Sequence, residues 1–243
     1  MNNYDSTTAA HYSAFRPGLH LPILKKCLYP KTSFPLGLDV GCGTGQSALA
    51  LAHFCKKVVG IDSSEAMLQK AISHTNVTYA HCNGTDLYYP DNCFDVITFA
   101  GSLFYAKSQE LLNETLRVCN SEARIVIYDF EILLDETLIK LGVIPPSAET
   151  INYNHAVNFS GLNERHTTLR KNGTEKKLIE INAENLAHLL LSDNNHYILL
   201  NRKFGESNLF AKLVAQLNKL TPKETAQHVP SQLYFSVYRC AKK

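Results

Sequence analysis

Hydrophobic residues between positions 36 and 130 follow two alternating patterns. Short apolar runs rich in β-branched and aromatic residues, bounded by polar or glycine-rich segments, are typical of buried strands. Five strands are expected, at Leu36–Val40, Lys57–Asp62, Val77–Cys82, Phe94–Phe99 and Arg124–Phe130. Helical spacing separates them, and strands that alternate with helices need right-handed crossovers. The pattern therefore predicts an α/β fold, a doubly wound and mostly parallel sheet with helices on both faces.

Three of the connecting segments have helical patterns. Residues 46–55 are rich in Ala and Leu, and apolar residues recur at helical spacing between Met67 and Ile72 and between Leu111 and Cys119. Ser63 stands just before the second of these helices, where a side-chain oxygen can accept a hydrogen bond from a backbone N–H of the first turn. We therefore expect Ser63 to cap that helix.

The whole chain, residues 1–243, is expected to form a single domain. Residues 1–35 are expected to form a helical N-terminal extension, and residues 36–130 the core of alternating strands and helices. Residues 131–177 mix prolines, asparagines and glycines, which favours an insertion or lid with one strand or hairpin near 167–177. Residues 178–243 are expected to complete the sheet, with helices at 184–192 and 207–220 and a last strand at 233–240.

Composition excludes several classes of protein. The chain has 243 residues, 24 Lys and Arg against 22 Asp and Glu, and 45% hydrophobic residues, which is typical of a globular domain with no basic footprint for nucleic acid. Its seven cysteines form an odd number without a CxxC pair, so we expect all of them free and the protein cytoplasmic. No secretory signal or membrane span is expected, and the ten histidines are scattered, which argues against a metal site.

A glycine-rich loop follows the first expected strand. Residues 38–46 read Leu-Asp-Val-Gly-Cys-Gly-Thr-Gly-Gln. In a doubly wound sheet, ligands bind beyond the carboxyl ends of the strands, which is where this loop is expected. Gln46 occupies the place of the third glycine of the dinucleotide fingerprint, and Asp39 would repel a pyrophosphate. A dinucleotide is therefore disfavoured, whereas a ligand with an ammonium and a sulfonium group, S-adenosylmethionine, fits.

The next two strand ends add polar residues. Asp62 ends the second strand, where its carboxylate could accept hydrogen bonds from both ribose hydroxyls of an adenosyl group. Asn83 and Gly84 follow the third strand and could pair with the adenine edge through the amide and a backbone N–H. Asn83 could equally be an ordinary turn residue.

These segments together resemble the class I S-adenosylmethionine-dependent methyltransferases, in particular the type 11 methyltransferase domain. LDVGCGTGQ is similar to the first motif of that family, VVGIDSSEAML to the second and YPDNCFDVITF to the segment through the fourth strand, over about residues 36–130. AAHYSAFRP resembles the start of members that act on small carboxylic acids, such as trans-aconitate methyltransferase. Asn83 departs from the acid usual in the family. The resemblance implies a Rossmann-like fold with a lid insertion and these cofactor-binding residues: Arg16, Asp39, Gly41, Cys42, Gly43, Asp62, Ser63, Met67, Asn83, Gly84 and Ala100.

The expected reaction is methyl transfer from S-adenosylmethionine to a small organic molecule, with a carboxylic acid as one candidate. Because the methyl group of a sulfonium is already activated, alignment is the main requirement, and a base is needed only for a hydroxyl or carbon acceptor. Candidates for that base or for acceptor contacts are Tyr105, Tyr12, His11, Ser102 and Asp129. Arg16 could bind the methionyl carboxylate or be a surface residue, and Cys42 is expected to pack.

Three other functions stay open at this point. A methyltransferase acting on RNA or another macromolecule would show a basic groove, which the balanced composition does not indicate. A non-catalytic binding protein would bind S-adenosylmethionine without turnover. A dehydrogenase would need the third glycine that Gln46 replaces. The sequence predicts neither which atom is methylated nor the oligomeric state.

Overall fold

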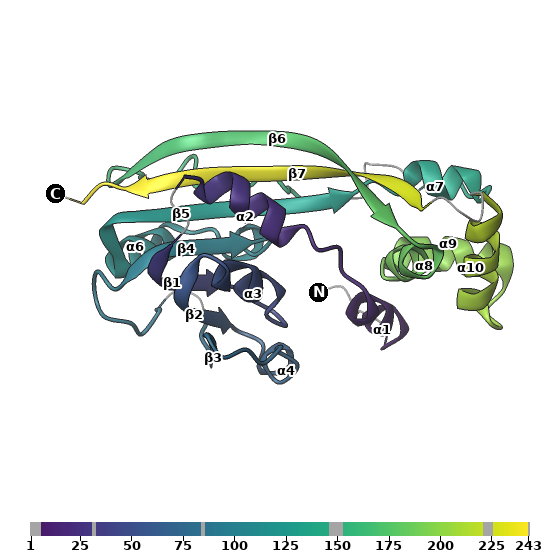
Figure 1. Cartoon of the computed structure of the whole chain (residues 1–243), viewed down its shortest axis with the longest axis horizontal. Coiled ribbons are helices and arrows are strands. Elements are labelled where there is room, and N and C mark those ends of the chain that lie inside the picture. Colours follow the sequence, from purple (N-terminus) through teal and green to yellow (C-terminus); the bar gives the residue numbers. More distant parts are fainter. Residues whose placement is uncertain (1–5, 31–32, 84–85, 146–152, 221–225, 243) are drawn as a thin grey trace. The chain divides into compact units, whose positions relative to one another are not determined.

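The computed structural model describes residues 6–30, 33–83, 86–145, 153–220 and 226–242 (Figure 1). Its strands are β1 (Phe34–Val40), β2 (Cys55–Asp62), β3 (Val77–His81), β4 (Phe94–Ala100), β5 (Cys119–Ile132), β6 (Thr167–Ile181) and β7 (Gln227–Cys240). Its helices are α1 (Ser6–Ala14), α2 (His20–Leu28), α3 (Gln46–Ala52), α4 (Glu65–Leu68), α5 (Leu103–Ala106), α6 (Gln109–Val118), α7 (Asp135–Lys140), α8 (Ala183–Leu191), α9 (Asn194–Phe204) and α10 (Leu209–Leu220).

The strands form one sheet in the order β3-β2-β1-β4-β5-β7-β6. The first five strands pair in parallel, so their carboxyl ends meet at one edge. Strand β7 is antiparallel to β6. Ala241 N, at the end of β7, donates to the carbonyl of His166, just before β6, whereas Ser236, earlier in β7, contacts Asn172, later in β6. The predicted doubly wound, mostly parallel sheet is confirmed, with one antiparallel strand inserted beside β5.

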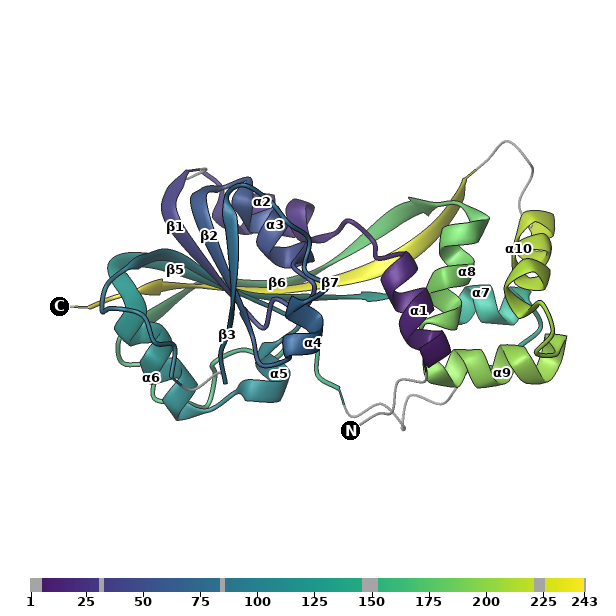
Figure 2. The same ribbon diagram turned by 90° about the horizontal axis from the view of Figure 1, so that it is seen from below.

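The chain divides into two compact units, where the sequence predicts one domain. The second unit, residues 18–130, 153–175 and 233–243, carries the parallel strands and helices α2 to α6. Helix α3 packs on β1 and β2 on one side, next to α2, and the apolar residues of α6, among them Leu111 and Leu112, join the core that surrounds Ile97 and Ile125 (Figure 2). This unit holds every strand end from β1 to β4.

The first unit, residues 1–17, 131–152 and 176–232, has its own hydrophobic core. Leucines of α7, α8, α9 and α10 are fully buried against one another, including Leu138, Leu190, Leu200 and Leu213, and Figure 2 shows α8, α9 and α10 side by side. Helix α9 was not expected from the pattern, because its first turn is polar; Asp193 caps it by accepting from His196 N. Segment 131–177 is divided between the units, so its role as a lid stays a prediction.

Several local predictions were wrong. The helix expected between Met67 and Ile72 ends at Leu68, and the last strand begins at Gln227 rather than at residue 233. Ser64, not Ser63, caps α4: its backbone is extended and its Oγ accepts from Met67 N at 3.3 Å, as a cap requires. Strand β5 begins at Cys119, directly after α6, rather than at Arg124. Asn120 supports this early start, because its amide donates to Asp95 of the neighbouring strand at 2.6 Å.

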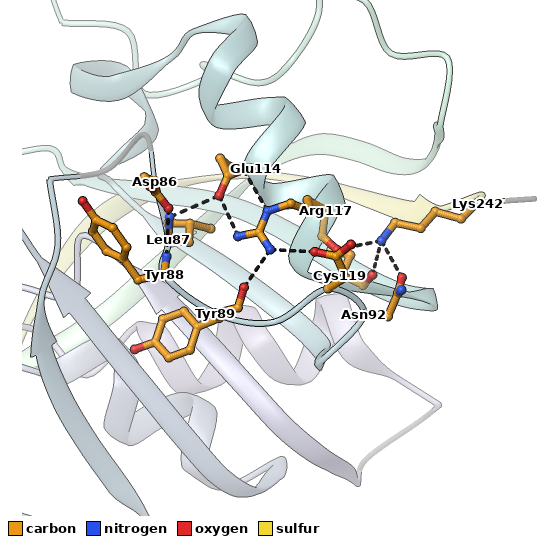
Figure 3. A network of polar contacts seen from close by, with 10 residues as sticks. Asp86, Leu87, Tyr88, Tyr89, Asn92, Glu114, Arg117, Cys119 and Lys242 are labelled. Atoms are coloured by element: carbon orange, nitrogen blue, oxygen red, sulfur yellow. Dashed lines mark hydrogen bonds and ion pairs between the residues drawn. The ribbon is translucent and has the colours of Figure 1, made fainter.

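A network around Arg117 anchors the crossover between β3 and β4 (Figure 3). The guanidinium binds Glu114 through two hydrogen bonds of 2.9 Å and donates to the Tyr89 carbonyl and to Asp91, each at 2.7 Å. Glu114 in turn accepts from Leu87 N at 3.2 Å. Hydrogen bonds to Arg117 lower the pKa of Glu114. The segment that follows the third strand is therefore fixed to α6 by charge-assisted hydrogen bonds.

We expect Arg117→Met to lower the free energy of unfolding by about 1–2 kcal/mol, because it removes these bonds but keeps the aliphatic length. Since the pKa of Glu114 is lowered in the folded protein, the loss should be largest at neutral pH and shrink as Glu114 is protonated in acid. Urea denaturation at two pH values measures both effects, with Glu110→Gln on the exposed side of α6 as the control. An unchanged midpoint would mean that apolar packing alone holds the crossover.

Candidate functional site

The glycine loop turns sharply where β1 ends. Gly41, Gly43 and Gly45 all have positive φ, of 72°, 55° and 90°, a conformation that favours glycine. Gly41 N and Cys42 N both donate to the Ile61 carbonyl, at 2.8 and 3.0 Å, which holds the loop against β2. Gly45 directly precedes α3. The loop therefore lies at the carboxyl edge of the sheet and leads into a helix N-terminus.

The three glycines differ in their surroundings. A Cβ on Gly41 would overlap Cβ of Ser102, and one on Gly45 would overlap the hydroxyl of Tyr79. A Cβ on Gly43 would meet no atom within 4 Å. Gly41 and Gly45 are thus required by packing within the protein, whereas Gly43 borders open space in which a ligand can approach the backbone.

Asp62 is held beside Gly43 by two backbone hydrogen bonds. Its Oδ2 accepts from Gly43 N and its Oδ1 from Ser64 N, each at 2.8 Å. Each carboxylate oxygen has a second lone pair, so the half-buried side chain can accept two more hydrogen bonds. The adjacent hydroxyls of a ribose are donors that match this arrangement, and the open space at Gly43 lies next to it.

Asp39 lies beneath the loop and is completely buried. Its Oδ2 accepts from Ser47 Oγ at 2.5 Å and its Oδ1 from Thr98 Oγ1 at 2.6 Å. Desolvation raises the pKa of this carboxyl to about 6, although the two hydroxyls oppose the shift. The structure thus gives Asp39 a part in joining β1, β4 and α3, and direct contact with a cofactor stays a prediction.

We expect Asp39→Asn to remove a pH dependence of stability. Because the pKa is raised above the unfolded value of 3.8, the folded state binds more protons than the unfolded state between about pH 4 and pH 6. The wild type should therefore lose up to about 3 kcal/mol as the pH rises through this window. Thermal unfolding from pH 4 to pH 7 measures the slope, and identical slopes for both proteins would disprove the assignment.

The other predicted cofactor residues lie at the same strand ends. Cys42 is buried in the loop, and burial raises the pKa of its thiol, so it packs there as a neutral group. Ser63 and Met67 are exposed after β2, Asn83 is exposed after β3, and Ala100 is half-buried at the end of β4. Gly84 lies outside the described residues. Contacts of these residues with a cofactor stay predictions.

The three N-terminal candidates belong to the first unit. His11 Nδ1 lies 2.9 Å from His188 Nδ1, and the His11 ring stacks on Phe210. The guanidinium of Arg16 lies 4.0 Å above the ring of Tyr12. Their roles toward cofactor or acceptor stay predictions.

Two residues without a sequence signal join the site of the second unit. Tyr153 and His155 both contact Asp129, close to the loop that carries Ser102 and Tyr105. Ser102 Oγ donates to the Val40 carbonyl at 2.5 Å, and Tyr105 is largely exposed. Tyr153 and His155 lie in a stretch without hydrophobic periodicity, so no local pattern could indicate them.

The described residues also limit other chemistries. They contain no group of three or more His, Cys, Asp or Glu side chains that could hold a metal ion. All seven cysteines are free, as predicted. None of the helices in this part of the chain combines the length and hydrophobicity needed to cross a membrane.

The parallel sheet, the glycine loop and Asp62 at the second strand end define a Rossmann-like domain of the class I methyltransferase type. A protein assigned as a type II methyltransferase from Anaeromyxobacter dehalogenans has the same fold, with a TM-score of 0.65 and 18% identity over 92% of this chain and 97% of that one. A protein assigned as a methyltransferase from Bacillus halodurans has a TM-score of 0.55 and 16% identity over 90% and 97%.

Residues 38–127 match the sequence profile of the methyltransferase domain family. The demethylmenaquinone methyltransferase of Clavibacter sepedonicus is 37% identical over 98 residues, which cover 38% of this chain. The match spans only 40% of the length of that relative. The resemblance at the N-terminus to carboxylic acid methyltransferases stays a prediction.

Proposed function

We propose that this protein transfers a methyl group from S-adenosylmethionine to a small organic molecule. The observation that carries the proposal is the Asp62 carboxylate, fixed by Gly43 N and Ser64 N beside the open face of a glycine loop. The match of residues 38–127 to the methyltransferase domain family supports the same conclusion.

Each strand end has a role in binding. Asp62 accepts hydrogen bonds from the ribose hydroxyls, the backbone at Gly43 allows close approach, and Asn83 with Gly84 binds the adenine edge. S-adenosylmethionine supplies the methyl group as a sulfonium, so the residues of the chain mainly hold the acceptor in line with it.

The acceptor is a small molecule that an aromatic surface can bind. Phe104, Tyr105 and Tyr153 group their rings beside the fourth and fifth strand ends, with centroids 4.5 to 5.7 Å apart. The relative from Clavibacter is named for demethylmenaquinone, which supports a quinone-type ring compound as one class. A small carboxylic acid is the other class to be tested.

Calorimetric titration with S-adenosylhomocysteine and with NAD tests the cofactor. The proposal requires binding of S-adenosylhomocysteine and none of NAD, and the reverse result would indicate a dehydrogenase. Formation of S-adenosylhomocysteine from S-adenosylmethionine should then be measured with naphthols and with small carboxylic acids such as trans-aconitate. Binding of S-adenosylhomocysteine without methylation of any acceptor would indicate a non-catalytic binding protein.

A further inference from the structure

Asp129, Tyr153 and His155 form a polar cluster within the second unit. Asp129 follows the buried part of β5, and its Oδ2 lies 2.8 Å from His155 Nδ1 and 3.0 Å from the Tyr153 hydroxyl. Both ionisable side chains are mostly covered, with 24% of the His155 side chain and 17% of the Asp129 side chain exposed. A histidine with a carboxylate on Nδ1 has a fixed tautomer, in which Nε2 is the basic nitrogen.

This cluster is connected to the glycine loop through Gly101 and Ser102. The Tyr153 hydroxyl lies 2.9 Å from the Gly101 carbonyl, and a Cβ on Gly101 would lie 3.2 Å from Asp129 Oδ1. The next residue, Ser102, touches Gly41 so closely that no Cβ fits there. Only Gly101 and Ser102 thus separate the cluster from the glycine loop that faces the proposed cofactor.

Aromatic rings surround the histidine. The His155 ring stacks on Tyr234 with a centroid distance of 5.4 Å and an interplanar angle of 13°, and it meets the edge of Tyr153 at 4.6 Å. On its other side Tyr153 packs against Phe104 at 4.5 Å. A cavity of about 130 Å³ is lined by His155, Tyr234 and Phe235.

We propose that His155, positioned by Asp129, is the general base for methylation of a hydroxyl on a planar aromatic acceptor that binds among these rings. The proposal rests on the proposed methyltransferase function and adds the acceptor class and the base. An imidazole, unlike a carboxylate, can take a proton near neutral pH and return it to solvent. A carboxylic acid acceptor would need no such base.

The reaction balances without another reactant. His155 Nε2 takes the hydroxyl proton while an electron pair of the acceptor oxygen forms the bond to the methyl carbon. The carbon–sulfur bond breaks with its electron pair on sulfur, so the sulfonium becomes a neutral thioether. The imidazolium that forms is paired with the Asp129 carboxylate, and it loses its proton to water after product release.

A purely structural role, in which the hydrogen bond between His155 and Asp129 only holds residues 153–157 against β5, predicts different behaviour. His155→Gln keeps a side chain that can donate to Asp129 but cannot act as a base. Under the proposal this variant should bind S-adenosylhomocysteine as the wild type does and lose at least about a hundredfold in kcat on 2-naphthol. It should lose less than about tenfold on 4-nitrophenol, which is already ionised at mildly alkaline pH.

The pH profile is the second measurement. The wild-type kcat on 2-naphthol should rise between about pH 5 and pH 8, where histidine titrates, and the rise should be absent in His155→Gln. Asp129→Asn should also be slow on 2-naphthol, because the tautomer is no longer held. His166→Gln, an exposed histidine of the same unit outside the cluster, is the matched control and should behave as the wild type.

Three results would overturn the proposal. The first is an equal loss of kcat in His155→Gln on 2-naphthol and on 4-nitrophenol, which would mean that His155 has only a structural role. The second is a wild type that binds S-adenosylhomocysteine but methylates only carboxylic acids or neither phenol, which leaves cofactor binding intact. The third is a wild type that does not bind S-adenosylhomocysteine, which contradicts the methyltransferase function itself.

Discussion

Replacing Asp62 by alanine is expected to weaken S-adenosylhomocysteine binding by at least about a hundredfold. The carboxylate is proposed to accept two ribose hydroxyl hydrogen bonds, each worth about 1.5–3 kcal/mol when the acceptor is charged. Loss of both corresponds to about 3 kcal/mol or more, hence the hundredfold effect. Asp62 also holds Gly43 N and Ser64 N, so the variant should lose about 1–3 kcal/mol of folding stability.

A matched control separates these two effects. Asp95 is also half-buried, also accepts from a backbone N–H, that of Leu36 at 2.8 Å, and lies near the amino end of β4, away from the carboxyl edge. Asp95→Ala should lose similar stability but keep its affinity for S-adenosylhomocysteine. Asp62→Asn should fall between wild type and alanine. Calorimetric titration of a folded Asp62→Ala with wild-type affinity would refute the ribose contact, although not the fold.

Gly41→Ala and Gly43→Ala are expected to fail in different ways. Both residues have positive φ, which costs an alanine about 1–2 kcal/mol. At Gly41 the methyl group also overlaps Cβ of Ser102, so the total loss of stability should reach about 3 kcal/mol or more. At Gly43 the methyl group enters open space, so the protein should fold but bind S-adenosylhomocysteine about ten- to a hundredfold more weakly.

Gly161→Ala is the control for backbone strain. Gly161 has a φ of 86°, and a Cβ there would meet no atom within 4 Å, as at Gly43, but the residue is outside the glycine loop. Urea denaturation should give Gly43→Ala and Gly161→Ala similar stabilities, and titration should show weak binding only for Gly43→Ala. Equal affinities would mean that the open face of Gly43 is not where the cofactor lies.

Asp39 and His155 illustrate two different limits of prediction from sequence. Asp39 stands two residues before Gly41, and its position in the motif was recognisable, but its complete burial between Ser47 and Thr98 depends on the packing of three elements. His155 has no motif at all. It reaches Asp129 across 26 positions of the chain, and only the folded chain brings the two together.

The local sequence was sufficient for the strands β1 to β4, for β5 from Arg124 onward, for their parallel pairing and for the glycine loop at Gly41–Gly45. Each of these strands contains a short apolar run, and the crossovers between parallel strands have a fixed hand. A backbone position with positive φ favours glycine. These features can therefore be recognised from short stretches of sequence. The division into two units, helix α9 and the Asp129–His155 contact were decided by tertiary structure. Their energy comes from burying surfaces contributed by distant segments, and such burial leaves no period or spacing in any one segment.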